Sequence, residues 1–249
     1  MVSSDRESVT AALVVIGDEV LSGRTKDRNI GFVAERMTEI GVELREVRVV
    51  SDDTDAIVEA VNALRARYDH VFTTGGIGPT HDDITADSIA RAFGVPIDVD
   101  PRAVALLKER IAEADLNEAR LRMARIPQGA DLIPNEVSKA PGFSIGNVHV
   151  MAGVPKIMQA MLWALIPKLE TGVRIMSRSL SAGVKEGDLA GPLRALDEAY
   201  PTVAMGSYPS WDEETGFTTT VVLRGRDAAV LDEAENKARE MLESIAVTG

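Results

Sequence analysis

Apolar residues in the first 170 positions alternate between short continuous runs and longer stretches with helical spacing. The six apolar residues at 11–16 are typical of a strand buried on both faces of a parallel sheet. From Asp27 to Ile40 the apolar positions recur at helical spacing, and Gly41 follows where a helix commonly ends. The same order continues with strands expected at 42–50, 71–74 and 95–99, helices at 54–68 and 84–93, and two helical segments within 101–125. This alternation predicts an α/β fold with a doubly wound, mostly parallel sheet.

A different order begins after the apolar helix that follows Pro155. The pattern predicts a strand at 173–182, a helix at 188–200, two strands at 202–207 and 217–224 joined by a turn, and a closing helix at 227–245. We therefore expect two domains, a large α/β domain over residues 1–170 and a small α+β domain over 171–249. No Gly/Ser-rich linker marks the boundary between them.

Composition excludes several classes of function. The chain has 39 acidic and 27 basic residues and a net charge of −12, so we expect no nucleic-acid partner. It has no cysteine, which rules out disulfides, thiolate metal sites and a cysteine nucleophile. No stretch is long and apolar enough to span a membrane, and the N-terminus lacks the basic-then-apolar order of an export signal. We therefore expect a cytoplasmic protein with no membrane partner.

Three loops stand out, because ligands of open α/β sheets bind beyond the carboxyl ends of the strands. They follow the first three predicted strands, at residues 17–29, 51–53 and 75–85. The third, Gly-Gly-Ile-Gly-Pro-Thr-His-Asp-Asp-Ile-Thr, has three glycines in four positions, whose N–H groups can approach a phosphate closely. It matches neither a P-loop nor a Rossmann fingerprint. A tight turn followed by a helix cap explains this loop about equally well.

The same three loops carry six carboxylates that a parallel sheet would bring to one edge. They are Asp18, Glu19, Asp52, Asp53, Asp82 and Asp83. Gathered like charges repel unless water separates them or a cation bridges them, and an all-oxygen set suits Mg²⁺ or another hard divalent ion. Such an ion would let an acidic protein hold an anionic phosphate. The alternative is that these acids solvate loops and cap helices; we favour the site.

The stretch from Val14 to Thr85 resembles the MoaB/MogA molybdopterin-binding domain, and more closely the N-terminal domain of the CinA (competence/damage-inducible) family. The resemblance rests on Gly-Asp-Glu-Val-Leu-Ser-Gly at 17–23 with Asn29, on Val-Ser-Asp-Asp at 50–53 and on the loop at 75–85. It extends through the motifs at 139–143 and 153–156, and thus over roughly residues 10–170. It implies a MoaB/MogA-like α/β fold, in agreement with the pattern above.

The resemblance also implies roles for individual residues. In MogA-like enzymes functional aspartates follow the second strand and lie in the glycine loop, which here are Asp52 and Asp83, expected to contact a metal or act as a base. We expect metal ligands among Asp18, Glu19, Asp52, Asp82 and Asp83. We expect substrate binding, with backbone N–H donors from the glycine loop, at Gly17, Ser22, Gly23, Asn29, Gly75, Gly76, Gly78, Pro79, Thr80, Thr85, Gly153 and Pro155. For the hydroxyls of Thr80 and Thr85 a capping role is an equal alternative, and plain helix initiation explains Pro155 almost as well.

In the CinA-like branch this pocket is associated with a metal-dependent pyrophosphatase acting on ADP-ribose and related dinucleotides. We therefore expect a hydrolase that uses Mg²⁺ or another divalent cation, with K⁺ as a further ion, on a nucleotide or pterin phosphate. The alternative is a non-catalytic module that holds molybdopterin. Residues 152–155 read Ala-Gly-Val-Pro where CinA proteins usually have Pro-Gly-Pro-Pro, which bears on the identity of the substrate.

Two further expectations come from the family. Its members tend to form dimers or trimers, so we expect a homo-oligomer. We expect no deamidase activity, because the C-terminal amidohydrolase domain of full-length CinA is absent from these 249 residues.

Overall fold

The computed structural model describes residues 2–3, 8–212 and 216–248 of the chain. It divides into two compact units, Met1–Gly172 and Val173–Gly249, which are described separately below. Most of the N-terminal segment that argues against an export signal lies outside the described residues. Within the described part of the chain, no helix combines the length and the apolar character needed to cross a membrane.

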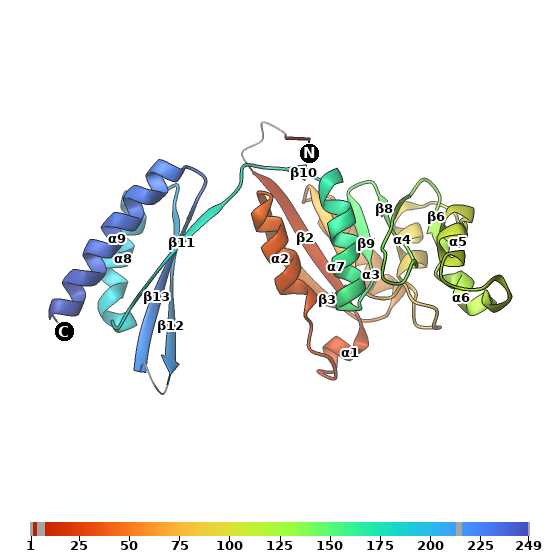
Figure 1. Cartoon of the computed structure of the whole chain (residues 1–249), viewed down its shortest axis with the longest axis horizontal. Helices are drawn as coiled ribbons and strands as arrows, with labels where there is room; N and C mark the ends of the chain where they lie inside the picture. Colours follow the sequence, from red (N-terminus) through yellow and green to blue (C-terminus); the bar gives the residue numbers. More distant parts are fainter. Residues whose placement is uncertain (1, 4–7, 213–215, 249) are drawn as a thin grey trace. The chain divides into compact units, whose positions relative to one another are not determined.

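The first unit is built on a six-stranded sheet with the order β3-β2-β4-β9-β8-β7 (Figure 1). Its strands are β3 (Val42–Val50), β2 (Val9–Ile16), β4 (His70–Thr74), β9 (Val148–Met151), β8 (Gly142–Ile145) and β7 (Asp131–Ile133). The first four of these run parallel, and the last two continue the sheet in antiparallel fashion. The predicted doubly wound, mostly parallel sheet is therefore confirmed.

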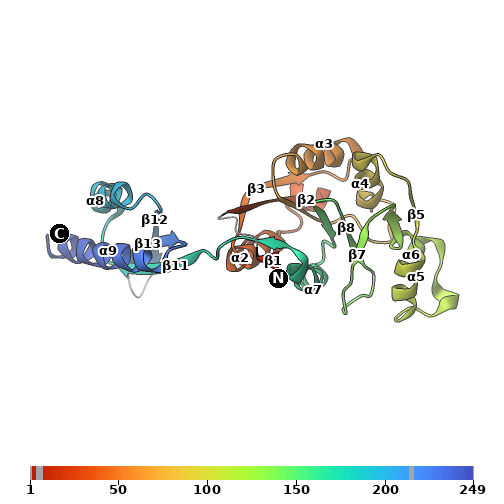
Figure 2. The ribbon, with the colours of Figure 1, turned by 90° about the horizontal axis from the view of Figure 1, so that it is seen from above.

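Helices cover both faces of this sheet, as Figure 2 shows. One face packs on α2 (Asn29–Glu39) and α7 (Pro155–Leu165), and the other on α3 (Thr54–Arg65) and α4 (Thr85–Phe93). Successive residues of β2 point to opposite faces, so Leu13 joins the core beneath α2 while Val14 joins the core beneath α3. Burial on both faces explains why this strand is a continuous apolar run.

Several short elements lie outside this alternation. A single helical turn, α1 (Asp18–Leu21), occupies the start of the first predicted loop. The strand expected at 95–99 is shorter, β5 (Ile97–Val99), and pairs antiparallel with β6 (Arg125–Pro127) as a separate ribbon rather than joining the main sheet. Its three residues are half-buried or exposed, so they lack the double burial of a central strand.

The remaining elements of the first unit are small. The two helical segments expected within 101–125 are α5 (Pro101–Lys108) and α6 (Glu118–Arg122), with a 3₁₀ turn, η1 (Glu113–Asp115), between them. A second 3₁₀ turn, η2 (Ile166–Lys168), follows α7, and the two-residue strand β1 (Val2–Ser3) pairs with β10 (Glu170–Thr171). These segments extend the unit without contributing strands to the central sheet.

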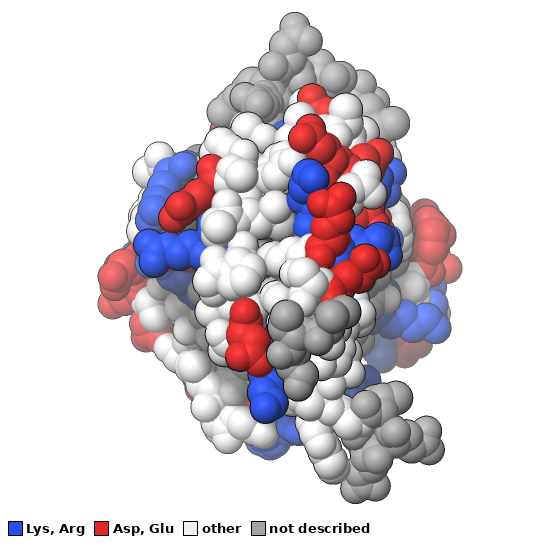
Figure 3. All heavy atoms as spheres, turned by 90° about the vertical axis from the view of Figure 1, so that its left-hand side faces the viewer, with Lys and Arg blue, Asp and Glu red and all other residues white. Residues whose placement is uncertain are grey.

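The second unit has the predicted β-α-β-β-α order. Its elements are β11 (Met176–Ala182), α8 (Glu186–Ala199), β12 (Ala204–Asp212), β13 (Gly216–Gly225) and α9 (Ala228–Thr248), and the antiparallel sheet has the order β11-β13-β12. Leu180, Leu189, Leu223 and Leu231 lie in its own core. The face seen in Figure 3 carries acidic and basic side chains side by side rather than one basic patch. The small α+β unit is thus confirmed.

Candidate functional site

The parallel register brings the ends of four strands level at one edge of the sheet. Ile16 of β2 lies beside Val50 of β3, and Thr74 of β4 lies beside Met151 of β9. Two glycine N–H groups continue this pairing past the strand ends, because Gly17 donates to the Val50 carbonyl and Gly75 to the Met151 carbonyl, both at 3.1 Å. The loops that follow these strands therefore start side by side.

The glycine-rich loop at 75–85 is closed by its own hydrogen bonds. The Asp83 carboxylate accepts from the N–H groups of Gly78 at 2.6 Å and Thr80 at 2.8 Å, and from the Thr80 hydroxyl at 2.5 Å. The buried Thr85 hydroxyl donates to the Gly75 carbonyl at 3.0 Å. The side chains of Asp83, Thr80 and Thr85 thus hold the shape of the loop. None of them caps α4, whose N-cap is Ile84 without a side-chain cap bond.

Close backbone approaches require glycine at two positions of this loop. Gly75 has φ +108°, and a Cβ there would lie 2.1 Å from the Ile16 carbonyl oxygen. Gly76 has φ +66°, and a Cβ there would lie 2.1 Å from the Thr85 hydroxyl oxygen. From the other side, a Cβ on Gly153 would come within 3.2 Å of the Gly75 Cα. The loop after β4 and the turn before α7 therefore pack against each other, backbone to backbone.

The donors available to a ligand differ from those that we expect from the sequence. Gly75 and Gly78 already have partners for their N–H groups, the Met151 carbonyl and the Asp83 carboxylate. Within the described part of the chain, no hydrogen bond uses the N–H of Gly76 or of Ile77. Two adjacent unpaired backbone donors of this kind suit an anionic oxygen.

These donors border a cavity of about 500 Å³, a size suited to a small ligand. Pro79 and Asp83 of the glycine loop and Gly153 and Pro155 of the turn before α7 line it. Its apolar lining includes Ile77, Met123, Ala140, Ile157 and Met161. The cavity thus joins hydrogen-bond donors at one edge to an apolar wall.

The surroundings of Asp52 disfavour the charge of its carboxylate. It accepts a hydrogen bond from the backbone N–H of Asp18 at 2.9 Å, which lowers its pKa. Burial outweighs that bond, and repulsion from Asp18, Glu19 and Asp82 acts in the same direction, so the pKa of Asp52 is raised above its usual value. Asp18, Glu19 and Asp82 therefore lie close enough to Asp52 to repel its charge.

The other two acids have structural partners. Asp53 is the N-cap of α3 and accepts from the Ala56 N–H at 2.9 Å, as the helix-cap alternative expects. Asp83 is bonded within its own loop. No group of three or more acidic or histidine side chains among the described residues is arranged to hold a metal ion. The set fits a divalent cation that keeps several waters and takes further ligands from a phosphate, and does not fit an ion held by protein alone.

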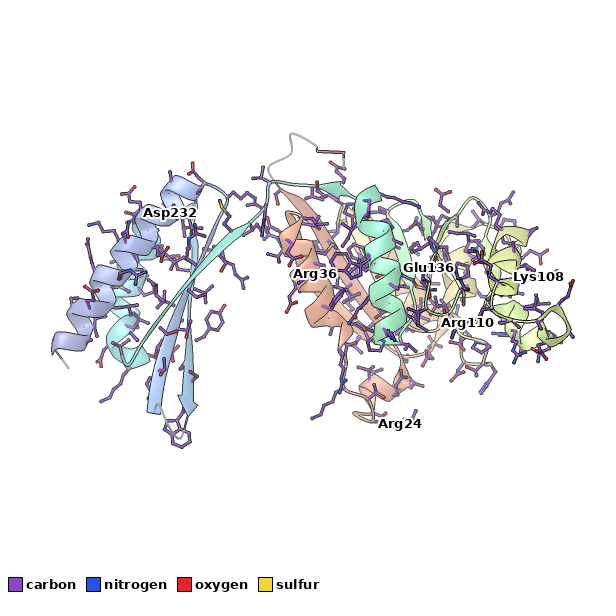
Figure 4. All side chains as sticks on the ribbon, in the orientation of Figure 1. Arg24, Arg36, Lys108, Arg110, Glu136 and Asp232 are labelled. Carbon is purple, nitrogen blue, oxygen red and sulfur yellow. The ribbon has the colours of Figure 1, made fainter. Side chains whose placement is uncertain are left out.

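The remaining predicted binding residues are divided between the site and its surroundings. Asn29 is buried at the start of α2, and its side-chain amide donates to the Gly153 carbonyl at 2.9 Å. Ser22 and Gly23 lie in an exposed turn after α1, where the Ser22 hydroxyl donates to the Glu19 carbonyl at 3.3 Å. Arg24 extends from the same turn into solvent (Figure 4). Asn29 thus ties α2 to the turn before α7, whereas Ser22 and Gly23 stay at the surface.

The structure also brings in residues that sequence patterns did not single out. Met123 follows α6, and Met161 lies on α7, yet both line the cavity beside the glycine loop. Arg122 donates from its guanidinium to the Asp83 carbonyl at 3.2 Å. Helical spacing marks Met161 only as a core residue, and no pattern links 122–123 to the loop. Their role depends on tertiary packing.

Each of the two units matches the model of a known protein family. Residues 12–171 match the family model described as "Probable molybdopterin binding domain", and residues 174–248 match "FAD synthase, middle domain". A protein of Aeropyrum pernix is 32% identical over 96% of this chain and 93% of its own length. A CinA-like protein of Citrifermentans bemidjiense is 40% identical over 76% of this chain and 49% of its own length, so this chain spans about half of that relative.

A solved structure extends the comparison to three dimensions. The crystal structure of a CinA protein of unknown function from Thermoplasma acidophilum superposes with a TM-score of 0.62 at 36% sequence identity. The match covers 66% of this chain and 99% of that chain.

Proposed function

This chain belongs to the CinA-type family of molybdopterin-binding-domain proteins, and we propose that it is a divalent-metal-dependent hydrolase of nucleotide diphosphates such as ADP-ribose. One observation carries the proposal: unpaired backbone donors border a cavity whose lining includes Glu19, one of the carboxylates that repel the charge of Asp52. Glu19 belongs to both features, because it lines the cavity and raises the pKa of Asp52. The arrangement joins a place for phosphate to a place for a cation.

The cavity suits both ends of such a substrate. A phosphate oxygen would accept from the N–H groups of Gly76 and Ile77, and the base would lie against the apolar wall that contains Met123 and Met161. The hydrogen bonds that Asp83 accepts would keep the donors in place. In this proposal Asp83 positions the loop and Asp52 takes part in the chemistry.

The carboxylates would act together with a divalent cation such as Mg²⁺. A bound cation neutralises phosphate charge and lowers the pKa of a water that attacks phosphorus. Asp52, aided by Asp18 or Glu19, would hold that cation through one or two oxygens, and the substrate would supply others. A raised pKa also brings Asp52 nearer to the range in which a carboxylate accepts a proton from water.

The experiment is a substrate panel with product chromatography. ADP-ribose, FAD and NADH are incubated with Mg²⁺, Mn²⁺ or Co²⁺, with and without K⁺, and with EDTA as the control. We expect ADP-ribose and water to give AMP and ribose 5-phosphate only when a divalent ion is present. Absence of turnover for all three substrates with every ion would remove the proposal.

A second candidate is a module that binds molybdopterin without chemistry. The observation that favours it is the lack of a preformed set of three metal ligands among the described residues. The apolar cavity wall would also accept a pterin ring. Calorimetry combined with chromatography separates the two candidates, since this one requires retention of the pterin phosphate and no product from any nucleotide.

We further propose, on the family resemblance, that the chain is a cytoplasmic homo-oligomer, either a dimer or a trimer. Sedimentation velocity of the purified protein tests the oligomeric state, and cell fractionation tests the location. A single sedimenting species with the mass of one chain would overturn the proposed homo-oligomer.

A further inference from the structure

A second, smaller hollow adjoins the cavity. This recess of about 60 Å³ lies where β2 and β4 end and α2 begins. It shares Glu19, Thr25, Gly153 and Pro155 with the larger cavity, so the two hollows are neighbours along the same sheet edge. The recess is large enough for several water molecules or the edge of a sugar, and too small for a nucleobase.

Two residues that line this recess carry buried side-chain oxygens without partners. Asn29 is 4% exposed and Thr74 is 1% exposed, and both are lining residues. Neither Oδ1 of Asn29 nor Oγ1 of Thr74 has a hydrogen-bond partner among the residues that the structure describes. Buried polar atoms in native proteins nearly always have partners, so a pair of orphans beside one recess indicates a ligand group or water that completes them.

The hydrogen-bonding chemistry of the two side chains limits what that group can be. The amide of Asn29 donates to the Gly153 carbonyl at 2.9 Å, which leaves Oδ1 as an acceptor. An ionised phosphate has no proton to give to it. The recess is lined by two basic residues, Lys26 and Arg28, and by two acidic residues, Glu19 and Asp27, so its formal charges balance and favour a neutral group. A neutral hydroxyl has the chemistry that each atom needs, because it can donate to Asn29 Oδ1 and can accept from the Thr74 hydroxyl.

We propose that this recess binds a hydroxyl of the sugar that lies beyond the diphosphate, with Asn29 and Thr74 as specificity-determining residues. The inference rests on the proposed function and narrows its substrate class. It favours substrates in which the diphosphate joins two sugar-containing halves over nucleoside diphosphates that end in phosphate. The base and first phosphate use the larger cavity, and the second sugar uses the recess.

Thr73 offers a matched control for Thr74. Its hydroxyl is also buried and, in the described structure, also lacks a partner. Side chains alternate along β4, so Thr73 points with Val71 toward the core beneath α3, whereas Thr74 lies on the face that includes Phe72. Thr73→Val and Thr74→Val each remove one orphan hydroxyl and keep the shape of the side chain, but only Thr74 lines the recess.

The test compares two probes whose methylene bridges resist hydrolysis, the α,β-methylene analogues of ADP-ribose and of ADP. Binding is measured by calorimetry in Mg²⁺ buffer, and the melting temperature of each variant is recorded. We expect Thr74→Val to weaken binding of the ADP-ribose analogue roughly three- to tenfold and to leave the ADP analogue unchanged. Thr73→Val should change neither, and Thr74→Ser, which keeps the hydroxyl, should retain the preference for the ADP-ribose analogue.

The outcomes separate this inference from the proposed function. Equal effects of Thr74→Val on both probes, or no effect on either, would overturn the sugar recess while leaving nucleotide binding intact. A melting temperature several degrees lower in Thr74→Val than in Thr73→Val would assign the hydroxyl a structural role and also overturn it. If the wild type binds neither probe, the proposed function is wrong, and the sugar recess, which rests on it, is overturned as well.

Discussion

The Asp52 carboxylate accepts a hydrogen bond of 2.9 Å from the backbone N–H of Asp18. The bond joins the ends of β2 and β3 and holds a half-buried charge beside other acids. Asp52 is therefore kept in place by a backbone donor although its neighbours repel it. The position of the Asp52 side chain and the charge of its carboxylate can therefore be tested separately.

Asp52→Asn should remove the charge and keep the oxygen that accepts from Asp18. We expect the free energy of unfolding to stay within about 0.5 kcal/mol of the wild type. Hydrolysis of ADP-ribose should fall by roughly 100-fold or more, because the cation and the proton acceptor depend on that charge. Urea unfolding and product chromatography measure the two effects.

Its neighbour provides the control. Asp53 caps α3, and Asn is as good an N-cap as Asp, so Asp53→Asn should match the wild type in both stability and turnover. Full activity in Asp52→Asn, or equal loss in the two variants, would remove the special role of Asp52.

Asp83→Ala should loosen the glycine-rich loop. The carboxylate accepts two backbone N–H groups and one hydroxyl, so its removal should lower the free energy of unfolding by about 1 to 3 kcal/mol. Phosphate binding should weaken in parallel. The adjacent Asp82 is exposed and its pKa is lowered mainly by a contact with Thr80, so Asp82→Ala should lower the stability less than Asp83→Ala in the same urea titration. Equal stability of the two variants would contradict the loop-holding role of Asp83.

Gly75→Ala should be strongly destabilising, because the new Cβ would lie 2.1 Å from the Ile16 carbonyl at φ +108°. We expect a loss of about 3 kcal/mol or more in unfolding free energy. Gly23 also has a positive φ, +72°, but no described atom lies within 4 Å of a Cβ there, so Gly23→Ala should lose only about 1 kcal/mol. Thermal and urea unfolding of the pair measure the difference, and similar losses would speak against a steric requirement at Gly75.

A buried pair of histidines should make the first unit sensitive to acid. His149 Nε2 lies 3.2 Å from His70 Nδ1, the Ser144 hydroxyl lies 2.9 Å from His149 Nδ1, and His70 Nε2 lies 3.0 Å from the Glu170 carbonyl oxygen. That carbonyl can only accept, so the His70 Nε2–H donates to it, the His149 Nε2–H donates to His70, and the Ser144 hydroxyl donates to His149. The chain is complete with both rings neutral, and an added proton would break it.

Burial lowers the pKa of His149 from 6.5 to about 3, and that of His70 is lowered as well. A histidine that is neutral in the fold stabilises it above pH 6.5, and that contribution is lost as the pH falls from 6.5 toward 3. We expect His149 alone to lower the free energy of unfolding by about 1.5 kcal/mol between pH 6.5 and 5. Urea unfolding at several pH values measures the slope.

Two variants check the source of that slope. His149→Asn should make the slope shallower and leave the part that His70 contributes, whereas His81→Asn, at an exposed loop residue, should keep the full slope. An unchanged slope in His149→Asn would show that other groups cause the acid sensitivity.

Elements with strong periodicity could be predicted from the sequence, and short elements could not. The strand at Val42–Val50 has the predicted bounds, and the family predicted from the motifs at 17–23 and 75–85 is confirmed by a match over residues 12–171. The antiparallel strands β7 and β8 span only three and four residues, too few to show an alternation. The ribbon of β5 and β6 depends on a pairing between segments separated by α5 and α6.

The site was less predictable, because the partners of a carboxylate depend on turn geometry. The sequence places Asp53 and Asp83 in loops after strands, but only coordinates show that the first caps a helix and the second binds the N–H groups of its own loop. The unpaired donors of Gly76 and Ile77 follow from the same folding of the loop. The sequence shows which polar groups are present, but it does not show which of them already have hydrogen-bond partners.

The hydrogen bonds within the loop at 75–85 determine whether the entropy cost of ordering it falls on folding or on ligand binding. A glycine-rich segment loses much conformational entropy when it becomes fixed. Here Asp83 and Thr85 fix it during folding, so the phosphate proposed to bind here would meet a preorganised surface and would not need to order the backbone. Affinity at this turn would therefore vary with the ligand's own charge and shape rather than with the length of the loop. Relatives that differ in the cavity wall could then exchange one phosphorylated ligand for another while the turn stays the same.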